Sequence, residues 1–147
     1  ALLVLKGKKR RLLLKDLFLG PKKTALKKDE LILGFEIPKR RHAGAYLKLG
    51  PRAYFGISKA TVAVTAELSG GVVKMACVAL GSVAPVPLHA ARTSAWLVNK
   101  KLSAGTIAEA AALVRSEASP ITDTRSEAEY RREMCGVLLE RALKSMV

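Results

Sequence analysis

Few residues of this 147-residue chain have types and spacings that could support catalysis or metal binding. Histidine occurs twice, as His42 in a basic segment and as His89 near an expected helix start. The two cysteines, Cys77 and Cys135, lie far apart, and no CxxC or HxxxH spacing occurs. Metal sites normally draw on such closely spaced pairs. We therefore expect no metal site, a solvated His42, a partly exposed His89, and two cysteines buried as small hydrophobic residues.

A second candidate for a catalytic site is the stretch 119–134, SPITDTRSEAEYRREM. Its charged residues are four acids and three arginines: Asp123, Glu127, Glu129, Glu133, Arg125, Arg131 and Arg132. Clustered carboxylates can act as acid and base, but at these spacings they face arginines on a helix start. We therefore interpret the stretch as a helix start stabilised by ion pairs, with Pro120 ending the preceding helix.

Glycine-rich phosphate-binding loops are also missing from the sequence. The segments GPKK (20–23) and SGGVVK (69–74) match neither a P-loop nor a dinucleotide-binding fingerprint. The first indicates a turn and the second a hairpin. No catalytic residue is assigned on these grounds.

The formal net charge is +14, and it is concentrated near the N-terminus. Residues 1–48 contain fourteen lysines and arginines against four acidic residues. Such an imbalance predicts attraction to an acidic partner subunit, a phosphate group or nucleic acid. Few aromatic residues accompany these charges for base stacking, so a solvated face or a subunit contact is favoured over nucleic-acid binding.

Hydrophobic periodicity gives the elements that would position these residues. Half of the residues are hydrophobic, which suits a folded protein, and no apolar run is long enough to span a membrane. Short apolar runs at 1–6 and 10–14 predict a hairpin, and DELILGFEIP (29–38) predicts a strand that Pro38 stops. The composition changes after KRRH (39–42), so we place a domain boundary near residue 42.

The rest of the chain predicts three strands followed by three helices. The strands are expected at 44–50, 58–68 and 72–80, with a turn at Ser69-Gly70-Gly71. Pro87 suits the first turn of a helix over 88–97. Capping boxes at Thr106–Glu109 and Ser126–Glu129 predict the starts of two more helices. This is an α+β arrangement.

Four segments, taken in order, resemble one known family. They are LGPKKTALKKDELILGFEIP (19–38), YLKLGPRAYFGISKATVAV (46–64), VALGSVAPVPLHAARTSAWL (78–97) and PITDTRSEAEYRREMCGVLLERAL (120–143). The set resembles the FAD-binding medium subunit of the molybdenum hydroxylases, the xanthine dehydrogenase and carbon monoxide dehydrogenase family. The resemblance covers nearly the whole chain, and the last segment, with Asp-x-Arg followed by Tyr-Arg-Arg, is the most specific.

The resemblance implies a particular fold and domain organisation. Residues 43–147 would form the medium subunit's C-terminal domain, a three-stranded antiparallel sheet packed with a three-helix bundle. Residues 1–42 would be a short, basic, β-rich remnant of the FAD-binding domain. The family's glycine-rich pyrophosphate segments have no counterpart here, so the chain resembles a C-terminal fragment, a split subunit or a truncated product.

The resemblance also implies a role beside FAD. Ile32 matches a position whose backbone touches the isoalloxazine ring, and Lys48 matches a lysine near the flavin. The expected function is to give one wall of the flavin site and subunit contacts in an oxidoreductase complex. A cytoplasmic location is expected from the two distant cysteines, Cys77 and Cys135, which suit a reducing compartment. In that family electrons pass from a molybdenum centre through iron–sulfur clusters and FAD to an external acceptor.

The expected partners are the upstream FAD-binding part, the iron–sulfur small subunit and the molybdenum large subunit. The chain alone is not expected to be active or to bind FAD tightly. The alternative is a basic, non-enzymatic interaction module that binds an acidic partner or nucleic acid.

Overall fold

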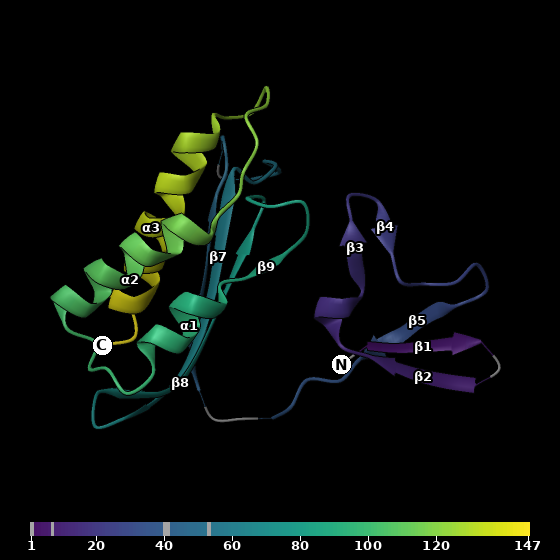
Figure 1. Cartoon of the computed structure of the whole chain (residues 1–147), viewed down its shortest axis with the longest axis horizontal. Helices are drawn as coiled ribbons and strands as arrows, with labels where there is room; N and C mark the ends of the chain where they lie inside the picture. The colour runs from purple at the N-terminus through teal and green to yellow at the C-terminus, as the bar shows by residue number, and fades with distance from the viewer. Residues whose placement is uncertain (1, 7, 40–41, 53) are drawn as a thin grey trace. The chain divides into compact units, whose positions relative to one another are not determined.

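The chain forms two compact units, Ala1–Arg40 and Arg41–Val147, which we call the N-terminal and C-terminal units. The computed structural model, drawn in Figure 1, describes residues 2–6, 8–39, 42–52 and 54–147. Each unit has its own sheets and its own cluster of buried apolar side chains.

The N-terminal unit contains two small antiparallel sheets. The first has the order β2-β1-β5, with β1 (Leu2–Lys6), β2 (Lys8–Leu12) and β5 (Leu31–Phe35). The second pairs β3 (Phe18–Gly20) with β4 (Lys23–Thr24), after a 3-10 helix at Leu14–Asp16. The predicted first hairpin and the predicted strand before Pro38 are both confirmed. The expected hairpin turn at Gly7 lies outside the described residues.

A small cluster and an ion pair stabilise the N-terminal unit. Leu17 is buried and contacts Leu12, Phe18 and Leu26. Arg10 of β2 donates from Nε and Nη2 to the two carboxylate oxygens of Glu30, at 3.0 and 2.7 Å. The same carboxylate accepts the backbone N–H of Lys27 at 2.8 Å. These hydrogen bonds tie the segment before β5 to β2.

The C-terminal unit has a four-stranded antiparallel sheet, one strand more than predicted. Its order is β6-β7-β8-β9, with β6 (Ala43–Leu49), β7 (Ala60–Ser69), β8 (Val72–Gly81) and β9 (Leu88–His89). The predicted helix start at 88 is wrong, because Leu88 and His89 pair with Leu80 and Ala79 of β8. Pro87 therefore precedes a strand.

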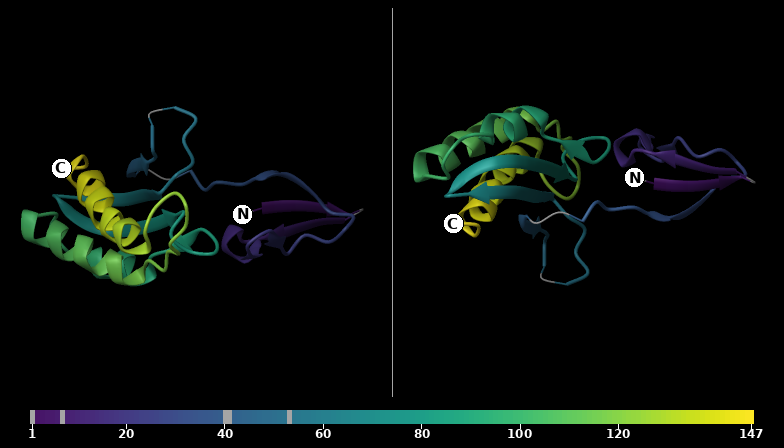
Figure 2. Two further views of the ribbon diagram at one scale, coloured as in Figure 1. Left: turned by 90° about the horizontal axis from the view of Figure 1, so that it is seen from above. Right: turned by 90° about the horizontal axis from the view of Figure 1, so that it is seen from below.

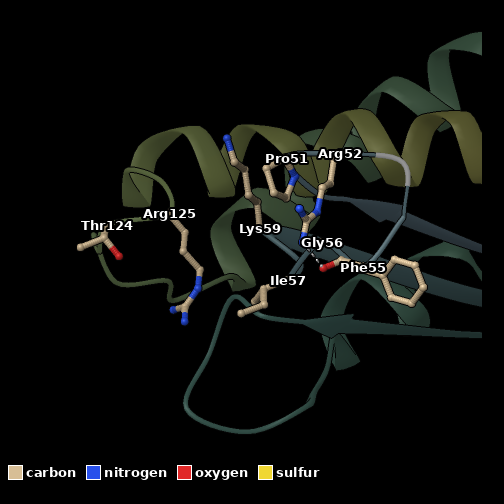
Figure 3. A pocket seen from close by; sticks show the side chains of 8 residues that line it. All are labelled: Pro51, Arg52, Phe55, Gly56, Ile57, Lys59, Thr124 and Arg125. Atoms are coloured by element: carbon tan, nitrogen blue, oxygen red, sulfur yellow. Dashed lines mark hydrogen bonds between the residues drawn. The ribbon is translucent and has the colours of Figure 1, made fainter.

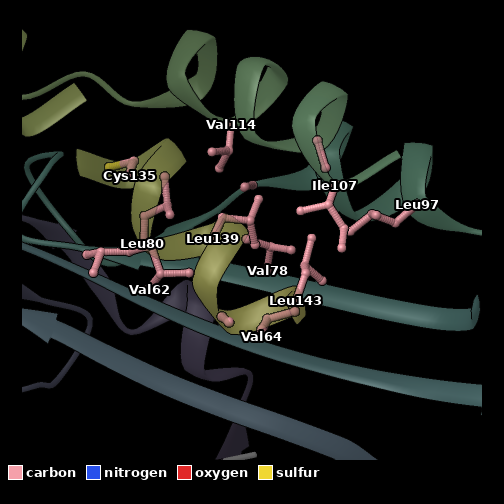
Figure 4. Close-up of a cluster of buried hydrophobic side chains, with 14 of the residues drawn as sticks. Val62, Val64, Val78, Leu80, Leu97, Ile107, Val114, Cys135, Leu139 and Leu143 are labelled. Atoms are coloured by element: carbon pink, nitrogen blue, oxygen red, sulfur yellow. The ribbon is translucent and has the colours of Figure 1, made fainter. Parts of the chain in front are cut away.

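Three helices cover one face of this sheet. They are α1 (Ala91–Leu97), α2 (Ala104–Glu117) and α3 (Ala128–Lys144), as predicted in number. Figure 1 shows these helices on one side of the strands β7 and β8, and in both views of Figure 2 the green helix α2 lies beside the teal strands while the yellow helix α3 crosses them. Burial alternates along β7, where Ala60, Val62, Val64 and Ala66 are buried. Figure 4 shows valines of β7 and β8 meeting side chains of all three helices.

The helix starts differ from the predicted capping boxes. The N-cap of α2 is Ser103, whose Oγ accepts the N–H of Thr106 at 3.2 Å. At α3 the N-cap is Glu127, and the Thr122 hydroxyl accepts the N–H of Ala128 at 3.0 Å. Thr106 and Ser126 are thus not N-caps, because nearby hydroxyls reach the free N–H groups instead.

The start of α1 is stabilised from another helix. Glu117, the last residue of α2, accepts the backbone N–H groups of Arg92 and Thr93 at 3.0 and 2.8 Å. A carboxylate at a helix N-terminus satisfies free donors and complements the helix dipole. Ser94 adds a link to the sheet, because its Oγ accepts the N–H of Val78 at 2.9 Å.

Candidate functional site

Lys48 lies near the end of β6, on the face of the sheet that the helices leave open. Its neighbours Leu47 and Leu49 pack against the core. Since side chains alternate along a strand, Tyr46 and Lys48 point the other way, and both are exposed. Lys48 pairs in register with Thr61 of β7, which pairs with Gly81 of β8. The strand neighbours of Lys48 on this face, Thr61 and Gly81, are thus both small.

A shallow hollow lies beside Lys48. It has a volume of about 450 Å³ and is lined by Lys48, Leu49, Gly50, Pro51 and Arg52. A Cβ placed on Gly50 would lie 3.8 Å from Cε of Lys48, so the lysine side chain runs close to this loop. The loop is closed at its base, where the N–H of Lys59 donates to the carbonyl of Leu49 at 2.8 Å.

A second cavity of about 510 Å³ adjoins this hollow and shares Pro51 and Arg52 with it. Two loops line it, one after β6 and one between α2 and α3: Pro51, Arg52, Phe55, Gly56, Ile57, Lys59, Thr124 and Arg125. Figure 3 shows Arg52 and Arg125 coming from different loops, with Ile57 between them in this view. We call it the loop cavity.

Ile32, the other predicted site residue, lies in the centre of β5 in the N-terminal unit and pairs in register with Val4. Its side chain is 41% exposed, and those of its neighbours Leu31 and Leu33 are more so. Ile32 thus belongs to the N-terminal unit and Lys48 to the C-terminal unit.

The charged stretch at the start of α3 forms the expected ion pairs. Arg131 is buried, and it binds the Asp123 carboxylate through Nη2 and the carbonyl of Ser82 through Nη1. Arg132 pairs with Glu129, and Arg115 of α2 pairs with Glu133. The interpretation of this stretch as an ion-paired helix start is confirmed.

Asp123 is the centre of this arrangement. Its carboxylate accepts the backbone N–H groups of Arg125 and Ser126 at 2.8 and 3.3 Å. It also pairs with the guanidinium groups of Arg125 and Arg131. The hydrogen bond from the Arg125 backbone, followed by that from the Arg131 side chain, lowers the pKa of Asp123 to about 2. Sequence reasoning identified the ion pairs but missed that Asp123 joins a buried arginine to one that lines the loop cavity.

The histidines and cysteines do not gather into a site. His42 and His89 are both exposed, and among the described residues no three His, Cys, Asp or Glu side chains could hold one metal ion. Cys135 is buried as predicted, and burial raises the pKa of its thiol to about 11. The prediction for Cys77 is wrong, since it is exposed on the open face of β8.

No helix in the described part of the chain has the length and apolar content needed to cross a membrane. The comparisons with known proteins agree on one family. Residues 45–146 match the model of the CO dehydrogenase flavoprotein C-terminal domain. This match covers β6 to α3 and includes Lys48 and the loop cavity.

Curated relatives include two medium chains of dehydrogenases. The chain is 35% identical over 132 residues to the carbon monoxide dehydrogenase medium chain of Afipia carboxidovorans, covering 88% of this chain and 46% of that one. It is 30% identical over 131 residues to the glyceraldehyde dehydrogenase medium chain of Sulfolobus acidocaldarius, covering 89% of this chain and 47% of that one. The chain therefore spans about half the length of these relatives.

Solved structures show the same fold. A cyanide-inactivated Cu,Mo-CO dehydrogenase matches with a TM-score of 0.87 and 32% identity, over 97% of this chain and 51% of that one. The carbon monoxide dehydrogenase of Hydrogenophaga pseudoflava matches with a TM-score of 0.91 and 29% identity, over 97% of this chain and 50% of that one. The chain thus belongs to the CO dehydrogenase flavoprotein C-terminal domain family, the C-terminal part of a molybdenum hydroxylase flavoprotein subunit.

Proposed function

We propose that this chain supplies one wall of the FAD site in a molybdenum hydroxylase-type oxidoreductase. The observation that carries the proposal is the family match over residues 45–146, which includes the exposed ammonium of Lys48. Because the chain spans about half of its relatives, the remaining walls would come from the upstream FAD-binding part. The iron–sulfur small subunit and the molybdenum large subunit are the other proposed partners.

Lys48 has a physical reason to lie beside a flavin. Bound FAD would carry electrons between iron–sulfur clusters and an external acceptor. An ammonium near its ring favours the negative charge that develops on reduction, and an environment of low dielectric constant strengthens this effect. Lys48 is held by β6 at its backbone, while its side chain runs beside the loop at Gly50.

Ile32 is the proposed apolar contact in the N-terminal unit. It lies on β5 among exposed apolar residues, a surface that suits a large planar ring. Tight FAD binding also needs backbone N–H groups around the pyrophosphate, as in a glycine-rich turn. Since neither glycine segment of this chain has that form, FAD binding is proposed for the assembled subunit.

The exposed, unpaired Cys77 and the buried, unpaired Cys135 agree with a reducing compartment. A cytoplasmic location of the complex is therefore part of the proposal. The net charge of +14 supports contact with acidic surfaces of the partner subunits.

The test is complementation by the missing half of the subunit. The chain is produced alone and together with the N-terminal half of the Afipia carboxidovorans medium chain, and each sample is passed through gel filtration. We expect the isolated chain to be colourless and the mixture to elute as a yellow complex with one FAD. A colourless mixture, or a yellow isolated chain with stoichiometric FAD, would contradict the proposal.

Two matched variants then test whether Lys48 acts on the midpoint potential of the bound flavin. Lys48→Gln is expected to lower the midpoint potential of the bound flavin, because one positive charge beside the ring is lost. Lys74→Gln removes an equally exposed lysine from β8 and should leave the potential unchanged. Equal shifts in both variants would show that Lys48 acts only through the overall charge.

A further inference from the structure

Strand β6 forms an open edge of the C-terminal sheet, whereas the opposite edge is closed. At the closed edge the N–H of Val78 in β8 donates to Oγ of Ser94, and the Val78 carbonyl accepts the N–H of Ala90, both at 2.9 Å. β9 covers the end of the same strand. Among the described residues, the side of β6 that faces away from β7 has no such partner. A free strand edge of this kind is a template for pairing with another chain.

The alternation of hydrogen bonds across the sheet identifies which backbone groups of β6 face the open edge. Val78 turns its backbone groups to the closed edge, so its neighbour in β7, Val64, turns its own toward β6. Val64 pairs with Ala45, whose backbone groups are therefore used inside the sheet. The pairing of β6 with β7 has no register shift, so the alternation continues along the whole strand. The residues whose backbone groups point outward are Gly44, Tyr46 and Lys48.

The side chains of β6 also lack cover at this edge. Leu47 and Leu49 pack against the core but are only partly buried, whereas Val62 of the next strand is fully buried. Tyr46, on the open face, is 63% exposed. The strand contains one charged residue and no proline, although charges and prolines commonly protect strand edges from pairing. One more strand beside β6 would therefore complete the burial of its leucines.

The sequence of β6, AGAYLKL, complements itself when a second copy runs antiparallel with Tyr46 opposite Tyr46. Around this centre each large side chain lies opposite a small one: Leu47 opposite Ala45, Lys48 opposite Gly44, and Leu49 opposite Ala43. The outward backbone groups also match, because they are arranged symmetrically about Tyr46. Each facing pair of outward residues can therefore exchange both of its N–H···O hydrogen bonds.

We propose that two copies of this chain associate through β6, related by a two-fold axis at Tyr46. The two C-terminal sheets join into one, and the helices of both copies lie on the same face, because directly opposite residues of antiparallel strands share a face. Since the β8 edge is closed, no third copy can extend the sheet, and the assembly ends at a dimer. The pairing uses only the backbone of Lys48, so it does not rest on the proposed flavin site.

Sedimentation equilibrium of the whole chain at rising concentration is the first test. We expect the mass to rise from that of one chain to that of two, with a dissociation constant of about 10 μM, because a single strand pair buries a small area. A chain that stays monomeric up to about 1 mM would overturn the proposal. Masses that keep rising beyond the dimer would also overturn it, since the closed β8 edge allows only two copies.

Two substitutions of Gly44 test the register of the pairing. A side chain fits there, because a Cβ on Gly44 would lie 3.5 Å or more from its nearest neighbours. Gly44→Glu places a carboxylate opposite Lys48 of the second copy and should tighten the dimer several-fold, whereas Gly44→Lys should weaken it about tenfold. Ala112→Glu and Ala112→Lys make the same charge changes on the exposed side of α2 and should have much smaller effects. Equal effects at the two positions would overturn the proposal.

Single cysteines test the same register without a change of charge. In a Cys77→Ser background, Tyr46→Cys should form a disulfide between the copies on mild oxidation, because facing Cα atoms lie about 5.5 Å apart in such a pair. Gly44→Cys is the control, since its two copies lie four residues apart along the strands, about 14 Å, which is too far for a disulfide. Equal crosslinking of the two variants, or none of Tyr46→Cys, would overturn the proposal. This comparison remains decisive if Gly44→Lys fails to fold.

Discussion

In the C-terminal unit nineteen buried apolar residues form one core between the sheet and the helices. In the N-terminal unit the described residues 9–39 bury one, Leu17. Four apolar side chains in or next to β5 of this unit are more than half exposed: Leu31, Leu33, Phe35 and Ile37. An apolar strand exposed in this way is typical of a surface that other protein covers. The comparison indicates that the C-terminal unit is stabilised by its own packing, whereas residues 9–39 of the N-terminal unit are held more by strand pairing and polar contacts than by burial.

The largest expected effect comes from a cavity in the C-terminal core. Leu139→Ala removes a fully buried side chain of α3 and should lower the free energy of unfolding by about 2–5 kcal/mol. Chemical denaturation measures this loss. Amide exchange in β1, β2 and β5 should not change, because these strands belong to the other unit. Leu31→Ala, at a side chain that is 73% exposed, is the control and should cost little.

The next largest effect is expected at the start of α2, where two alanine variants test which residue is the N-cap. Ser103→Ala removes the N-cap hydroxyl and should cost about 1 kcal/mol in the free energy of unfolding. Thr106→Ala should cost clearly less, because it loses only the contact between its hydroxyl and Oγ of Ser103 and keeps the capped backbone N–H. A larger loss for Thr106→Ala than for Ser103→Ala would restore the original capping-box prediction. Denaturation curves of the two variants are compared directly.

A smaller and local effect is expected from the ion pair of the N-terminal unit. The Arg10 hydrogen bonds, then the Lys27 backbone, lower the pKa of Glu30 from its ordinary 4.5. The ionised Glu30 carboxylate therefore stabilises the N-terminal unit above pH 4.5, and this stabilisation is lost as the pH falls from 4.5 through the lowered pKa. Protection factors, which correct for the slower intrinsic exchange in acid, should fall in β2 and β5 on acidification, while those of β7 and β8 stay unchanged. Glu30→Gln should remove this difference in pH dependence, and identical profiles in both units would contradict it.

The smallest effect concerns the reactivity of the two cysteines. The exposed Cys77 should react with a thiol reagent in the native protein. Cys135 should not, because its burial raises its pKa to about 11 and keeps it a protonated thiol. A titration with Ellman's reagent should therefore find one reactive thiol in the native state and two in denaturant. Two reactive thiols in the native state would indicate that the C-terminal core opens readily.

Much of the C-terminal fold could be predicted from local patterns. The alternation along β7 and the Ser69-Gly70-Gly71 turn both indicate a hairpin, which is present. The predictions that proved wrong concern features that depend on contacts between residues distant in the sequence, or on a choice that the local pattern leaves open. Leu88 and His89 form a strand because β8 offers a free edge, and nothing within the segment itself signals that pairing. The sequence around Ser103 and Thr106 contains two hydroxyls three residues apart, so the local pattern leaves the helix start ambiguous.

The candidate site was predicted only in part for the same reason. Lys48 came from a resemblance to a family, and its exposure on a strand is consistent with the pattern of β6. The loop cavity was missed because Arg52 and Arg125 are brought together by the fold and not by their spacing in the sequence. The available signals were an arginine in a glycine- and proline-containing loop, GPRAYFG, and another in the turn TDTRSE.

The contact between Glu117 and the start of α1 has a consequence for the order of folding. A helix of seven residues is too short to be stable alone, and α1 receives its N-terminal acceptors from the last residue of α2. Its first turn can therefore become stable only after α2 has formed to its end. Formation and loss of α1 should accordingly be coupled to α2 in kinetic experiments, although α1 precedes α2 in the chain. Glu117→Ala would weaken this coupling and allow α1 to open while the hairpin of β7 and β8 stays closed.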